Sequence, residues 1–467
     1  MTILVRSGVV VFDPGHERVR LAALATWRRK GRVPKGEARV ARFFRMHRPD
    51  TDDPREWILL PRGLLHRVVE LYPNAEVVDR RLTVGAVEFG WRGTLWPEQR
   101  EAVRPLLEAD GGILVGPPGS GKTQAGLALI AACRQPALWI VNSKDLALQA
   151  LQRARSLFNL PARAFGLLGG GNAVLGTHFT ACMVQTLMHI GAAQLDRIAE
   201  HFGCVVVDEV HMTPARVISQ IVSHFPARYR YGLTATPYRS DGLDEAIGAL
   251  FGPAVGVIDR RHLLRRGRIV LPKVVGVPTP FVWHGDTFDW ARIQTARASD
   301  RRRNHLLCSL VQRQFRAGRH VLVLVDRKAH AHQLAELLSQ RYGTPAFAVT
   351  GPVPPRVRQR AYDLLEQGRV VLVATRLADQ GLDLPALDCL VLGAAARGDA
   401  LTDDKAPTPR LEQQVGRVMR ARRGKETPVI WDLWDVRVEP LRRQIAERIA
   451  IYRRLGLRVE QASGSNS

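Results

Sequence analysis

A glycine-rich stretch, GPPGSGKT at residues 116–123, has the composition of a loop that binds phosphate groups. Glycines let consecutive backbone N–H groups point at one anion, and a helix that begins directly after the loop adds the positive end of its dipole. Lys122 supplies a mobile positive charge, and the Thr123 hydroxyl is a suitable ligand for Mg²⁺. We therefore predict a nucleoside triphosphate site that also uses Mg²⁺. Its residues are Gly116, Pro117, Pro118, Gly119, Ser120, Gly121, Lys122 and Thr123.

Two adjacent carboxylates, Asp208 and Glu209, follow an apolar run in the stretch VVVDEVH at residues 205–211. A carboxylate at the end of a buried strand can hold Mg²⁺ through its water shell, and its neighbour can orient and deprotonate an attacking water molecule. Acidic residues at a strand end are also common as solvated or capping groups. Together with Lys122 and Thr123, however, the pair predicts that the bound triphosphate is hydrolysed.

A third stretch, LEQQVGRVMRARRGK at residues 411–425, contains arginines that could act in the same reaction. Phosphoryl transfer needs positive charge near the γ-phosphate in the transition state, and an arginine from another lobe often supplies it. Arg417 and Arg420 are three residues apart, so they would lie on one face of a helix. We expect both to face the nucleotide. The remaining basic residues are predicted to form a solvated or nucleic-acid-facing cluster: Arg422, Arg423 and Lys425.

The elements that must position these residues can be read from the hydrophobic pattern. From about residue 100, short runs rich in β-branched residues alternate with longer amphipathic stretches. This alternation is typical of parallel strands that crossover helices cover on both faces. The glycine-rich loop follows the run at 111–116, and the carboxylates end the run at 203–209. The sequence therefore predicts an α/β fold with two lobes, at residues 91–258 and 259–440.

The two ends of the chain are expected to differ from the lobes. Residues 1–90 alternate irregularly and place arginines among aromatic residues, which predicts a small α+β auxiliary domain. DNA binding and a purely structural cap on the first lobe are both open as its role. Residues 441–467 are predicted to form a C-terminal helix and a flexible tail.

The formal charge of +24 favours a polyanionic partner. Neutralising phosphates releases condensed counterions, which gives affinity for nucleic acid of any sequence. Arginine accounts for 60 of the 68 basic residues, a bias that GC-rich coding or a hot habitat could also produce. Five scattered cysteines without a C-x-x-C pair indicate no zinc or iron–sulfur site and fit reduced thiols. No run of 18 or more apolar residues occurs, so we expect a cytoplasmic protein with no membrane partner.

Four motifs in the order GPPGSGKT, DEVH, LTATPYRSDG and QQVGRVMR resemble the Walker A, Walker B, III and VI motifs of superfamily 2 helicases and translocases. The resemblance covers residues 91–435. TATPYRSDG and ATRLADQGLDLP are closer to the XPB-like, UvsW-like and restriction-motor branch than to the DEAD-box RNA helicases. The resemblance implies two tandem RecA-like P-loop lobes, ATP and Mg²⁺ as cofactors, and nucleic acid as partner, DNA rather than RNA.

The same resemblance gives expected roles to further residues near the nucleotide. Gln99 matches the Q-motif and would read the adenine edge. Trp96 would stack on the base where relatives often have Arg, although a core anchor is an equally open reading. Gln413 would help to hold the hydrolytic water. Gly381 and Asp383 would approach the nucleotide.

Motifs Ia, Ib, IV and V are implied to contact nucleic acid. Met183 departs from the usual Thr of motif Ib, which weakens any backbone contact assigned to this position. Gln380 stands where many relatives have Glu, so it is not expected to be catalytic. Thr234 and its two successors resemble the segment that links hydrolysis to lobe movement. The expected nucleic-acid contacts are Ser143, Gln185, Thr186, Arg327 and Thr375.

We therefore predict an ATP-dependent helicase or translocase that couples hydrolysis to movement on duplex or branched DNA, or to its remodelling. Protein partners in a repair, replication or defence complex are compatible with this prediction. Two alternatives stay open. One is an RNA helicase, and the other is a motor subunit of a restriction or defence complex that works only with a partner.

Overall fold

The computed structural model of the chain describes residues 2–28, 40–47, 55–235, 244–287, 289–351, 353–375, 384–394, 409–419, 421 and 427–462. The chain divides into two units, one ending at His262 and one beginning at Leu263. This division lies close to the boundary at 258/259 that the sequence suggests. The first unit contains the N-terminal domain and the first lobe, and the second unit contains the second lobe.

The first lobe is built on a sheet with the strand order β11-β10-β12-β9-β13-β14-β8-β15. All neighbouring strands run parallel except β10 and β11. Parallel strands with crossover helices are buried on both faces, which explains the unbroken apolar runs in the sequence. The strands are β8 (Gly111–Val115), β9 (Ala137–Val141), β10 (Phe165–Gly169), β11 (Asn172–Val174), β12 (Phe179–Met183), β13 (Cys204–Val207), β14 (Tyr229–Thr234) and β15 (Gly256–Val257).

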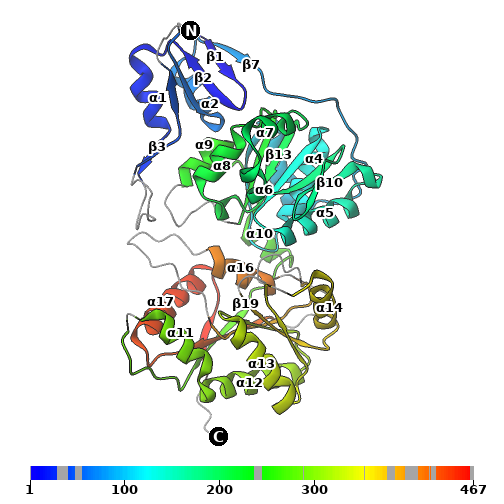
Figure 1. Cartoon of the computed structure of the whole chain (residues 1–467), viewed down its shortest axis with the longest axis vertical. Helices are drawn as coiled ribbons and strands as arrows, with labels where there is room; N and C mark the ends of the chain where they lie inside the picture. The colour runs from blue at the N-terminus through cyan, green and yellow to red at the C-terminus, as the bar shows by residue number, and fades with distance from the viewer. Residues whose placement is uncertain are drawn as a thin grey trace. The chain divides into compact units, whose positions relative to one another are not determined.

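Helices connect these strands and cover both faces of the sheet (Figure 1). The core between sheet and helices includes Val205 and Val207 of the central strand, both fully buried, with Ile218 and Ile221 packed in the same cluster. Each such side chain contributes about 1.5–3 kcal/mol when it leaves water. The helices are α3 (Pro97–Glu108), α4 (Lys122–Cys133), α5 (Lys144–Leu157), α6 (Val184–His189), α7 (Ala192–Ala199), α8 (Ala215–Val222) and α9 (Asp244–Phe251), with 3-10 turns η3 (Ala162–Ala164) and η4 (Val210–Met212).

The second lobe has an all-parallel sheet in the order β18-β19-β17-β20-β21-β16-β22. The interior strand β17 is buried along its whole length, and helices α12 and α13 pack against it. The strands are β16 (Lys273–Pro278), β17 (Val321–Val325), β18 (Ala346–Val349), β19 (Val371–Thr375), β20 (Cys389–Leu392), β21 (Val429–Trp434) and β22 (Val459–Gln461). The helices are α10 (Arg260–Arg265), α11 (Trp290–Ser299), α12 (Arg301–Arg316), α13 (Lys328–Arg341), α14 (Pro355–Glu366), α16 (Pro409–Val418) and α17 (Glu439–Arg454).

The C-terminal segment differs from the expected helix and tail. The helix α17 is present, but residues 459–461 then form β22, which pairs in parallel with β16. Lys273 and Glu460 form an ion pair across these two strands at 2.6 Å. A three-residue strand is too short to give a periodic signal in the sequence, and only the open edge of β16 selects it. The segment up to residue 462 therefore belongs to the second lobe.

The N-terminal domain contains a five-stranded mixed sheet in the order β5-β6-β2-β1-β7. One face of this sheet packs against two helices, with Ile3, Val11 and Ile58 fully buried between them. A separate two-stranded hairpin joins β3 and β4. The elements are β1 (Thr2–Val5), β2 (Gly8–Phe12), η1 (Gly15–Glu17), α1 (Arg18–Leu24), β3 (Thr26–Arg28), β4 (Val40–Arg42), β5 (Arg45–His47), β6 (Trp57–Pro61), η2 (Arg62–Leu64), α2 (Leu65–Leu71) and β7 (Glu76–Asp79).

A buried arginine joins this domain to the first lobe. Arg230 on β14 is 1% exposed and donates to the carbonyl oxygens of Ser7, Val222, Phe225 and Leu250, at 3.1, 2.9, 2.7 and 3.3 Å. Burial lowers the pKa of Arg230 to about 9, so the guanidinium stays charged at neutral pH. Ser7 lies in the N-terminal domain and the other three acceptors in the first lobe. The Arg230 guanidinium therefore links the N-terminal domain to the first lobe.

A close backbone contact accompanies this arginine. A Cβ on Gly63 of η2 would lie 2.4 Å from the carbonyl oxygen of Gly248 on α9, so any side chain at position 63 would separate the two elements. Arg62 donates to the carbonyl oxygen of Ala227, and Trp27 donates to Glu245 at 2.9 Å. The N-terminal domain is thus packed directly on the first lobe.

The predicted fold class is confirmed: both lobes are α/β with helices on both faces of largely or wholly parallel sheets. The five cysteines are free and buried. Among the described residues, no helix is both long enough and apolar enough to span a bilayer.

Candidate ATP site and nucleic-acid contacts

The glycine-rich loop connects β8 to α4 at the carboxyl end of β8. Gly119 (φ 81°) and Gly121 (φ 75°) have left-handed backbone conformations, which cost a residue with a Cβ roughly 1–2 kcal/mol. Gly121 is the N-cap of α4, so the helix begins at Lys122. The two glycines therefore let the loop turn sharply and bring its backbone to the start of a twelve-residue helix.

Lys122 is buried within this loop. Its Nζ donates to the carbonyl oxygen of Gly116 at 2.9 Å and lies 3.9 Å from Oε1 of Glu209. Ser120 is fully buried, and its Oγ has no hydrogen-bond partner among the described residues. A buried hydroxyl without a partner is costly unless a ligand completes it. The lysine, the hydroxyl and the helix N-terminus together fit the anionic oxygens of a phosphate chain.

The carboxylate pair lies at the end of β13, and β14 is the one strand between β13 and β8 in the sheet. The backbone N–H of Asp208 donates to the carbonyl oxygen of Ile140 at 2.9 Å, which extends the strand ladder by one residue. Glu209 then adopts a left-handed conformation (φ 49°, ψ 47°), and its N–H donates to Oδ1 of Asp208 at 2.9 Å. A non-glycine residue in this conformation is strained. With this backbone conformation, the Glu209 side chain lies beside Lys122.

The surroundings of Asp208 suit a divalent cation. Burial, and after it the charge of Glu209, raise the pKa of Asp208 to about 7, although Lys122 opposes the shift. A bound cation favours the ionised carboxylate. Among the described residues, no group of three or more His, Cys, Asp or Glu side chains could hold a metal alone. Mg²⁺ needs no such group, because one or two protein oxygens with phosphate oxygens and water suffice. Asp208 after β13 and Thr123 in the first turn of α4 have oxygens of the kind required.

A buried histidine links Glu209 to the neighbouring strand. His211 Nδ1 lies 3.4 Å from Oε2 of Glu209 and 2.8 Å from Oγ1 of Thr234. Thr234 ends β14, and its carbonyl oxygen accepts the N–H of Gly116 at 3.0 Å. The carboxylates, the glycine-rich loop and the end of β14 therefore form one connected set. Sequence analysis named Thr234 but gave no role to His211, although the quoted DEVH motif ends with it.

Gln99 contacts the glycine-rich loop itself. Its Oε1 accepts the N–H of Trp96 at 2.9 Å, and its Nε2 donates to the carbonyl oxygen of Ser120 at 2.9 Å. Trp96 is the half-buried N-cap residue of α3, and Pro97 opens the helix. These bonds fix α3 against the loop. Adenine contact by Gln99 and base stacking by Trp96 stay predictions.

Asn142, which follows β9, is contacted by Gln185 of the expected motif Ib and by Thr213, which lies outside the expected motifs. Gln185 Nε2 donates to the carbonyl oxygen of Asn142 at 3.1 Å, and Thr213 Oγ1 donates to Asn142 Oδ1. Ser143 caps α5 by accepting the N–H of Leu146 at 3.3 Å. Sequence analysis named neither Asn142 nor Thr213 as a site residue, because only tertiary contact relates residues 71 positions apart. The nucleic-acid contacts of Ser143 and Gln185 stay predictions.

The run at residues 181–186 forms a strand only in its first half. The strand β12 ends at Met183, whose register partner Val141 is the last residue of β9, and α6 begins at Val184. Beyond the edge of the sheet the chain has no strand to pair with, so it turns into a helix. Thr186 consequently lies on α6, where a Cβ added to Gly169 of β10 would lie 2.3 Å from its Oγ1.

The second lobe carries three of the expected residues in its described part. Arg327 is exposed at the N-cap of α13 and donates to the carbonyl oxygen of Ala291 at 2.9 Å. Thr375 ends β19, is 2% exposed, and its Oγ1 has no hydrogen-bond partner among the described residues. Arg417 is partly exposed on α16.

Other predicted site residues lie outside the described part of the chain. Gln413 belongs to α16, but its side chain is not among the described ones. The residues outside the described ranges are Gly381, Asp383 and Arg420 from the nucleotide set, Gln380, and Arg422, Arg423 and Lys425 from the basic cluster.

Two families match successive parts of the chain. The family described as type III restriction enzyme, res subunit, matches residues 92–239, and the helicase conserved C-terminal domain matches residues 302–422. The first match contains Lys122, Asp208 and Glu209, and the second contains Arg327 and Arg417. The two matches thus follow the division into lobes.

Similar proteins carry helicase names. A putative ATP-dependent RNA helicase of Acanthamoeba polyphaga mimivirus is 24% identical over 374 residues, covering 77% of this chain and 68% of that protein. A putative DNA 3'-5' helicase of Halobacterium salinarum is 29% identical over 340 residues, covering 70% of this chain but 52% of that protein. The matched region thus spans about half the length of the archaeal relative.

Solved structures support the fold. A fragment of a putative HsdR subunit of a type I restriction enzyme from Vibrio vulnificus superposes with a TM-score of 0.54 at 17% identity, covering 73% of this chain and 64% of that one. At this identity the likeness concerns the fold alone. With the two family matches in sequence order and the motifs that sequence analysis identified, the chain belongs to superfamily 2 of the helicases and translocases, a family of ATP-hydrolysing enzymes.

Proposed function

We propose that the protein is an ATP-driven motor that moves on or remodels DNA. One observation carries the proposal: Lys122, from the loop after β8, and Glu209, from the end of β13, meet with Nζ 3.9 Å from Oε1. A phosphate-binding cation thereby lies beside a carboxylate that can act on water. This pairing supports phosphoryl transfer from ATP to water.

Each residue of the site has a distinct task in this proposal. Lys122 binds the β- and γ-phosphates, and the loop N–H groups orient them. Glu209 orients the attacking water and takes its proton, which requires the ionised carboxylate. Mg²⁺ held by Asp208 and Thr123 would supply neutralisation of phosphate charge. His211 and Thr234 connect Glu209 to β14. Hydrolysis of the γ-phosphate can therefore alter the contacts at the end of this strand.

The second lobe would complete the reaction and hold nucleic acid. In this proposal Arg417 stabilises charge on the γ-phosphate when the lobes close on ATP, and Gln413 helps to hold the water. Ser143, Gln185 and Thr186 would contact the backbone of nucleic acid from the first lobe, and Arg327 and Thr375 from the second. Alternating grip by the two lobes during the ATP cycle produces movement along the strand.

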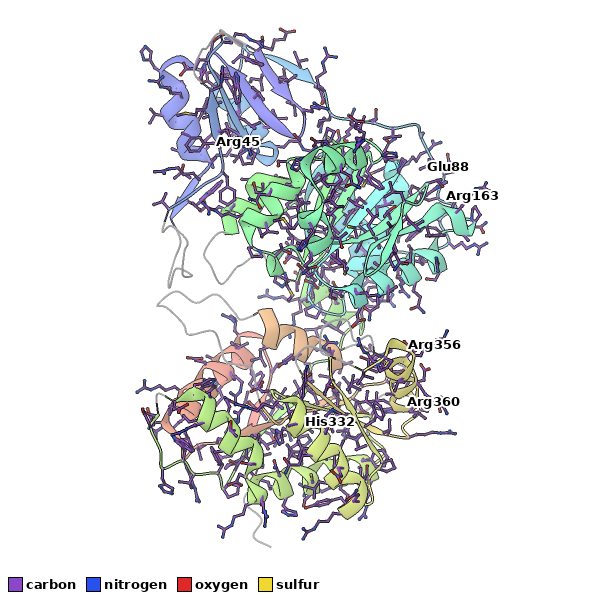
Figure 2. The ribbon with its side chains drawn as sticks, in the orientation of Figure 1. Arg45, Glu88, Arg163, His332, Arg356 and Arg360 are labelled. Atoms are coloured by element: carbon purple, nitrogen blue, oxygen red, sulfur yellow. The ribbon has the colours of Figure 1, made fainter. Side chains whose placement is uncertain are left out.

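Positive side chains on the second lobe support a polyanionic partner. Arg356 and Arg360 project from α14 at i and i+4 (Figure 2), and both are exposed. This charge suits phosphate backbones of any sequence, and its effect should weaken steeply as salt increases. DNA is favoured over RNA because the TATP motif is typical of the DNA branch and because the archaeal relative is named a DNA helicase. The mimivirus relative, named an RNA helicase, keeps RNA as the second candidate.

The proposed function is tested by the ATPase rate with and without nucleic acid. We expect forked or duplex DNA to raise the turnover number at least about tenfold, and single-stranded RNA to raise it less. Stimulation by RNA alone would favour an RNA helicase. A rate that no nucleic acid changes would contradict the motor. The family match to a restriction res subunit also favours a motor that needs a partner, which would appear as ATPase stimulation without strand displacement or branch migration.

We expect Arg417→Ala to lower DNA-stimulated turnover by about 100-fold, the typical loss when one charge-stabilising group leaves a transition state. DNA affinity should stay within about threefold, because in this proposal Arg417 acts on the nucleotide and the contacts to the nucleic-acid backbone come from other residues. The measurements are steady-state ATPase and fluorescence anisotropy with labelled DNA.

Arg313→Ala is the matched control for Arg417→Ala, because Arg313 is an exposed arginine on another helix of the same lobe and has no proposed role. It should leave turnover at saturating DNA unchanged. Normal turnover with lost DNA affinity in Arg417→Ala would assign this arginine to nucleic-acid binding instead of catalysis.

A further inference from the structure

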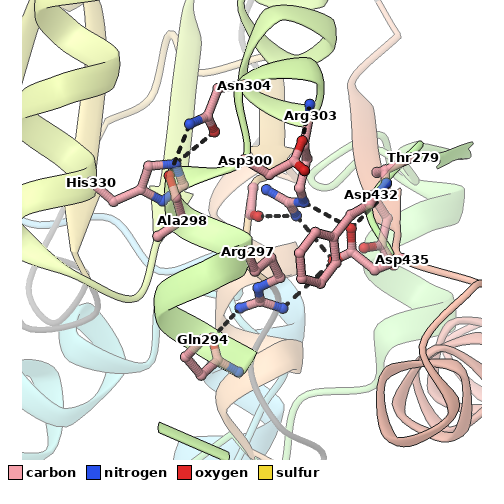
Figure 3. Close-up of polar contacts among 12 residues, drawn as sticks. Thr279, Gln294, Arg297, Ala298, Asp300, Arg303, Asn304, His330, Asp432 and Asp435 are labelled. Carbon is pink, nitrogen blue, oxygen red and sulfur yellow. Dashed lines mark hydrogen bonds and ion pairs between the residues drawn. The ribbon is translucent and has the colours of Figure 1, made fainter. Parts of the chain in front are cut away.

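The second lobe contains a network of buried charges that no step of the ATPase reaction uses. It lies where α11 meets α12 and includes Arg297 and Arg303, which are 5% and 1% exposed, and Asp435, which is 2% exposed (Figure 3). Buried ion pairs contribute little net stability, because removing the charges from water offsets their attraction. Packing alone therefore does not explain why charges occupy this site.

Asp435 is the centre of the network. It follows β21, and its carboxylate accepts from Arg303 Nε at 2.8 Å and from Thr279 Oγ1 at 2.5 Å, with Arg297 Nη1 3.7 Å away. Burial by itself would raise the pKa of Asp435, but Arg303 and Arg297 outweigh it and hold the pKa below its usual value. Thr279 follows β16, so the carboxylate joins the ends of two strands to α11 and α12.

The network reaches the predicted nucleic-acid contact Arg327 from both sides along the chain. Before it, Asp326 Oδ2 accepts from Arg297 Nη2 at 3.0 Å. After it, His330 Nε2 lies 2.9 Å from Oδ1 of Asn304, the residue next to Arg303. Burial, followed by the charges of Arg303 and Arg297, lowers the pKa of His330 to about 3, so the ring is neutral. The start of α13 is thus fixed at 326 and at 330, while Arg327 itself is exposed between them.

The same network also holds the end of β20. Arg303 Nη2 donates to the carbonyl oxygen of Gly393 at 2.5 Å. Gly393 directly follows β20, and the chain continues from there toward α16, which carries Arg417. One guanidinium therefore touches the chain just before the segment that leads to the proposed catalytic arginine. Arg297, on the preceding helix, fixes the residue next to Arg327.

We propose that Arg297, Arg303 and Asp435 are positioning residues that set Arg327 for contact with the nucleic-acid backbone and couple this contact to ATP turnover. The proposal rests on the proposed function, since it needs a nucleic-acid-stimulated ATPase. All three side chains are buried, so in this proposal they act without touching ATP or nucleic acid. They act by fixing the backbone on both sides of Arg327 and at Gly393, so their loss should weaken stimulation and leave nucleotide binding by the first lobe intact.

The same strand offers a matched control. Asp432 on β21 is fully buried and accepts two hydrogen bonds from Arg448, at 2.9 and 3.1 Å, and one from Tyr452 at 3.2 Å. It is three positions from Asp435, but its hydrogen-bond partners lie on α17, whereas Asp435 accepts from Arg303 on α12 and from Thr279 after β16. Asp435→Asn and Asp432→Asn each remove one buried carboxylate that pairs with arginine. Both variants should lower thermal stability to a similar extent, but only Asp435 belongs to the network.

The test compares these two variants in the full-length chain. We expect Asp435→Asn to raise the DNA concentration for half-maximal ATPase stimulation by about tenfold, within the range of coupling between neighbouring residues. The KM for ATP without DNA should change less than about twofold, since binding energy in the other lobe is untouched. Asp432→Asn should leave both quantities within about twofold of the wild type. Equal effects of the two variants on stimulation would overturn the proposal.

A double-mutant cycle with Arg327→Ala tests whether the network acts through this residue. If it does, Asp435→Asn should weaken stimulation about tenfold in the wild type but less than about twofold in the Arg327→Ala background. If the effects of Asp435→Asn and Arg327→Ala on stimulation were fully additive, this inference would be overturned. The proposed function would still hold, provided that DNA stimulates the wild type. Arg297→Lys, which keeps one charge, should recover part of the stimulation that Arg297→Met loses. A wild-type chain that no nucleic acid stimulates would overturn both this inference and the proposed function.

Discussion

Glu209→Gln is expected to hydrolyse ATP about 10³-fold more slowly than the wild type, the scale of a lost general base. This corresponds to about 4 kcal/mol in the activation barrier. The amide keeps the size of the side chain but cannot take a proton from water. ATP should still bind, because the substitution removes a negative charge 3.9 Å from Lys122 Nζ and close to where the phosphates would lie. Single-turnover hydrolysis and titration with a fluorescent ATP analogue separate the two effects.

Glu108→Gln is a suitable control for Glu209→Gln. Glu108 ends α3 in the same lobe, and its side chain is 71% exposed with only an i,i+4 pairing to Arg104. It should keep wild-type turnover. If Glu209→Gln hydrolysed ATP at more than about a tenth of the wild-type rate, another group would have to activate the water, and His211 would be the next candidate because it lies 3.4 Å from Glu209.

Lys122→Ala is expected to lower kcat/KM for ATP by about 10⁴-fold. A charge-assisted contact to phosphate contributes about 1.5–3 kcal/mol to binding, or roughly 10- to 100-fold in the dissociation constant. Stabilisation of the charge that develops during transfer accounts for about another 10²-fold. The substitution also removes the hydrogen bond that Lys122 Nζ donates to the carbonyl oxygen of Gly116 at 2.9 Å. Isothermal titration and steady-state kinetics measure the two contributions.

Lys144→Ala is the control for Lys122→Ala, because both lysines are the first residue of a helix in the first lobe. Lys144 is exposed and donates to the carbonyl oxygen of Gly170 at 3.0 Å, outside the proposed ATP site. It should leave ATP affinity unchanged. Equal losses from the two variants, with circular dichroism spectra like that of the wild type, would contradict a phosphate-binding role for Lys122.

The sequence predicted well what depends on neighbouring residues. The loop at 116–123 needs glycines where the backbone turns and a lysine where the helix begins, and all of these are consecutive. The runs that contain β8 and β13 were recognisable because strands buried on both faces are apolar throughout. Short elements such as β11, β15 and β22 were missed, since two or three residues carry no periodic signal and form only beside an existing strand edge.

Residues distant in sequence show where this reasoning stopped. Arg230 reads as one more basic residue in a chain of charge +24, and the charge alone would assign it to a nucleic-acid surface. In the structure it is almost completely buried and joins the N-terminal domain to the first lobe through backbone carbonyls. No sequence signal relates Asp435 to its partners, because the two arginines that pair with it lie more than a hundred positions earlier.

The sequence by itself determined which residue types are available for chemistry: a glycine-rich loop with a lysine, a carboxylate pair and an arginine motif, in the order typical of a two-lobed ATPase. These features are local, because the backbone turn and the side chain that uses it belong to the same few residues. The tertiary structure alone decided which polar groups meet, including His211 with Thr234, Asn142 with Thr213, and Asp435 with Arg303. Such pairs form only when packing brings separate strands and helices together, and a buried hydrogen bond leaves no periodic trace in the sequence.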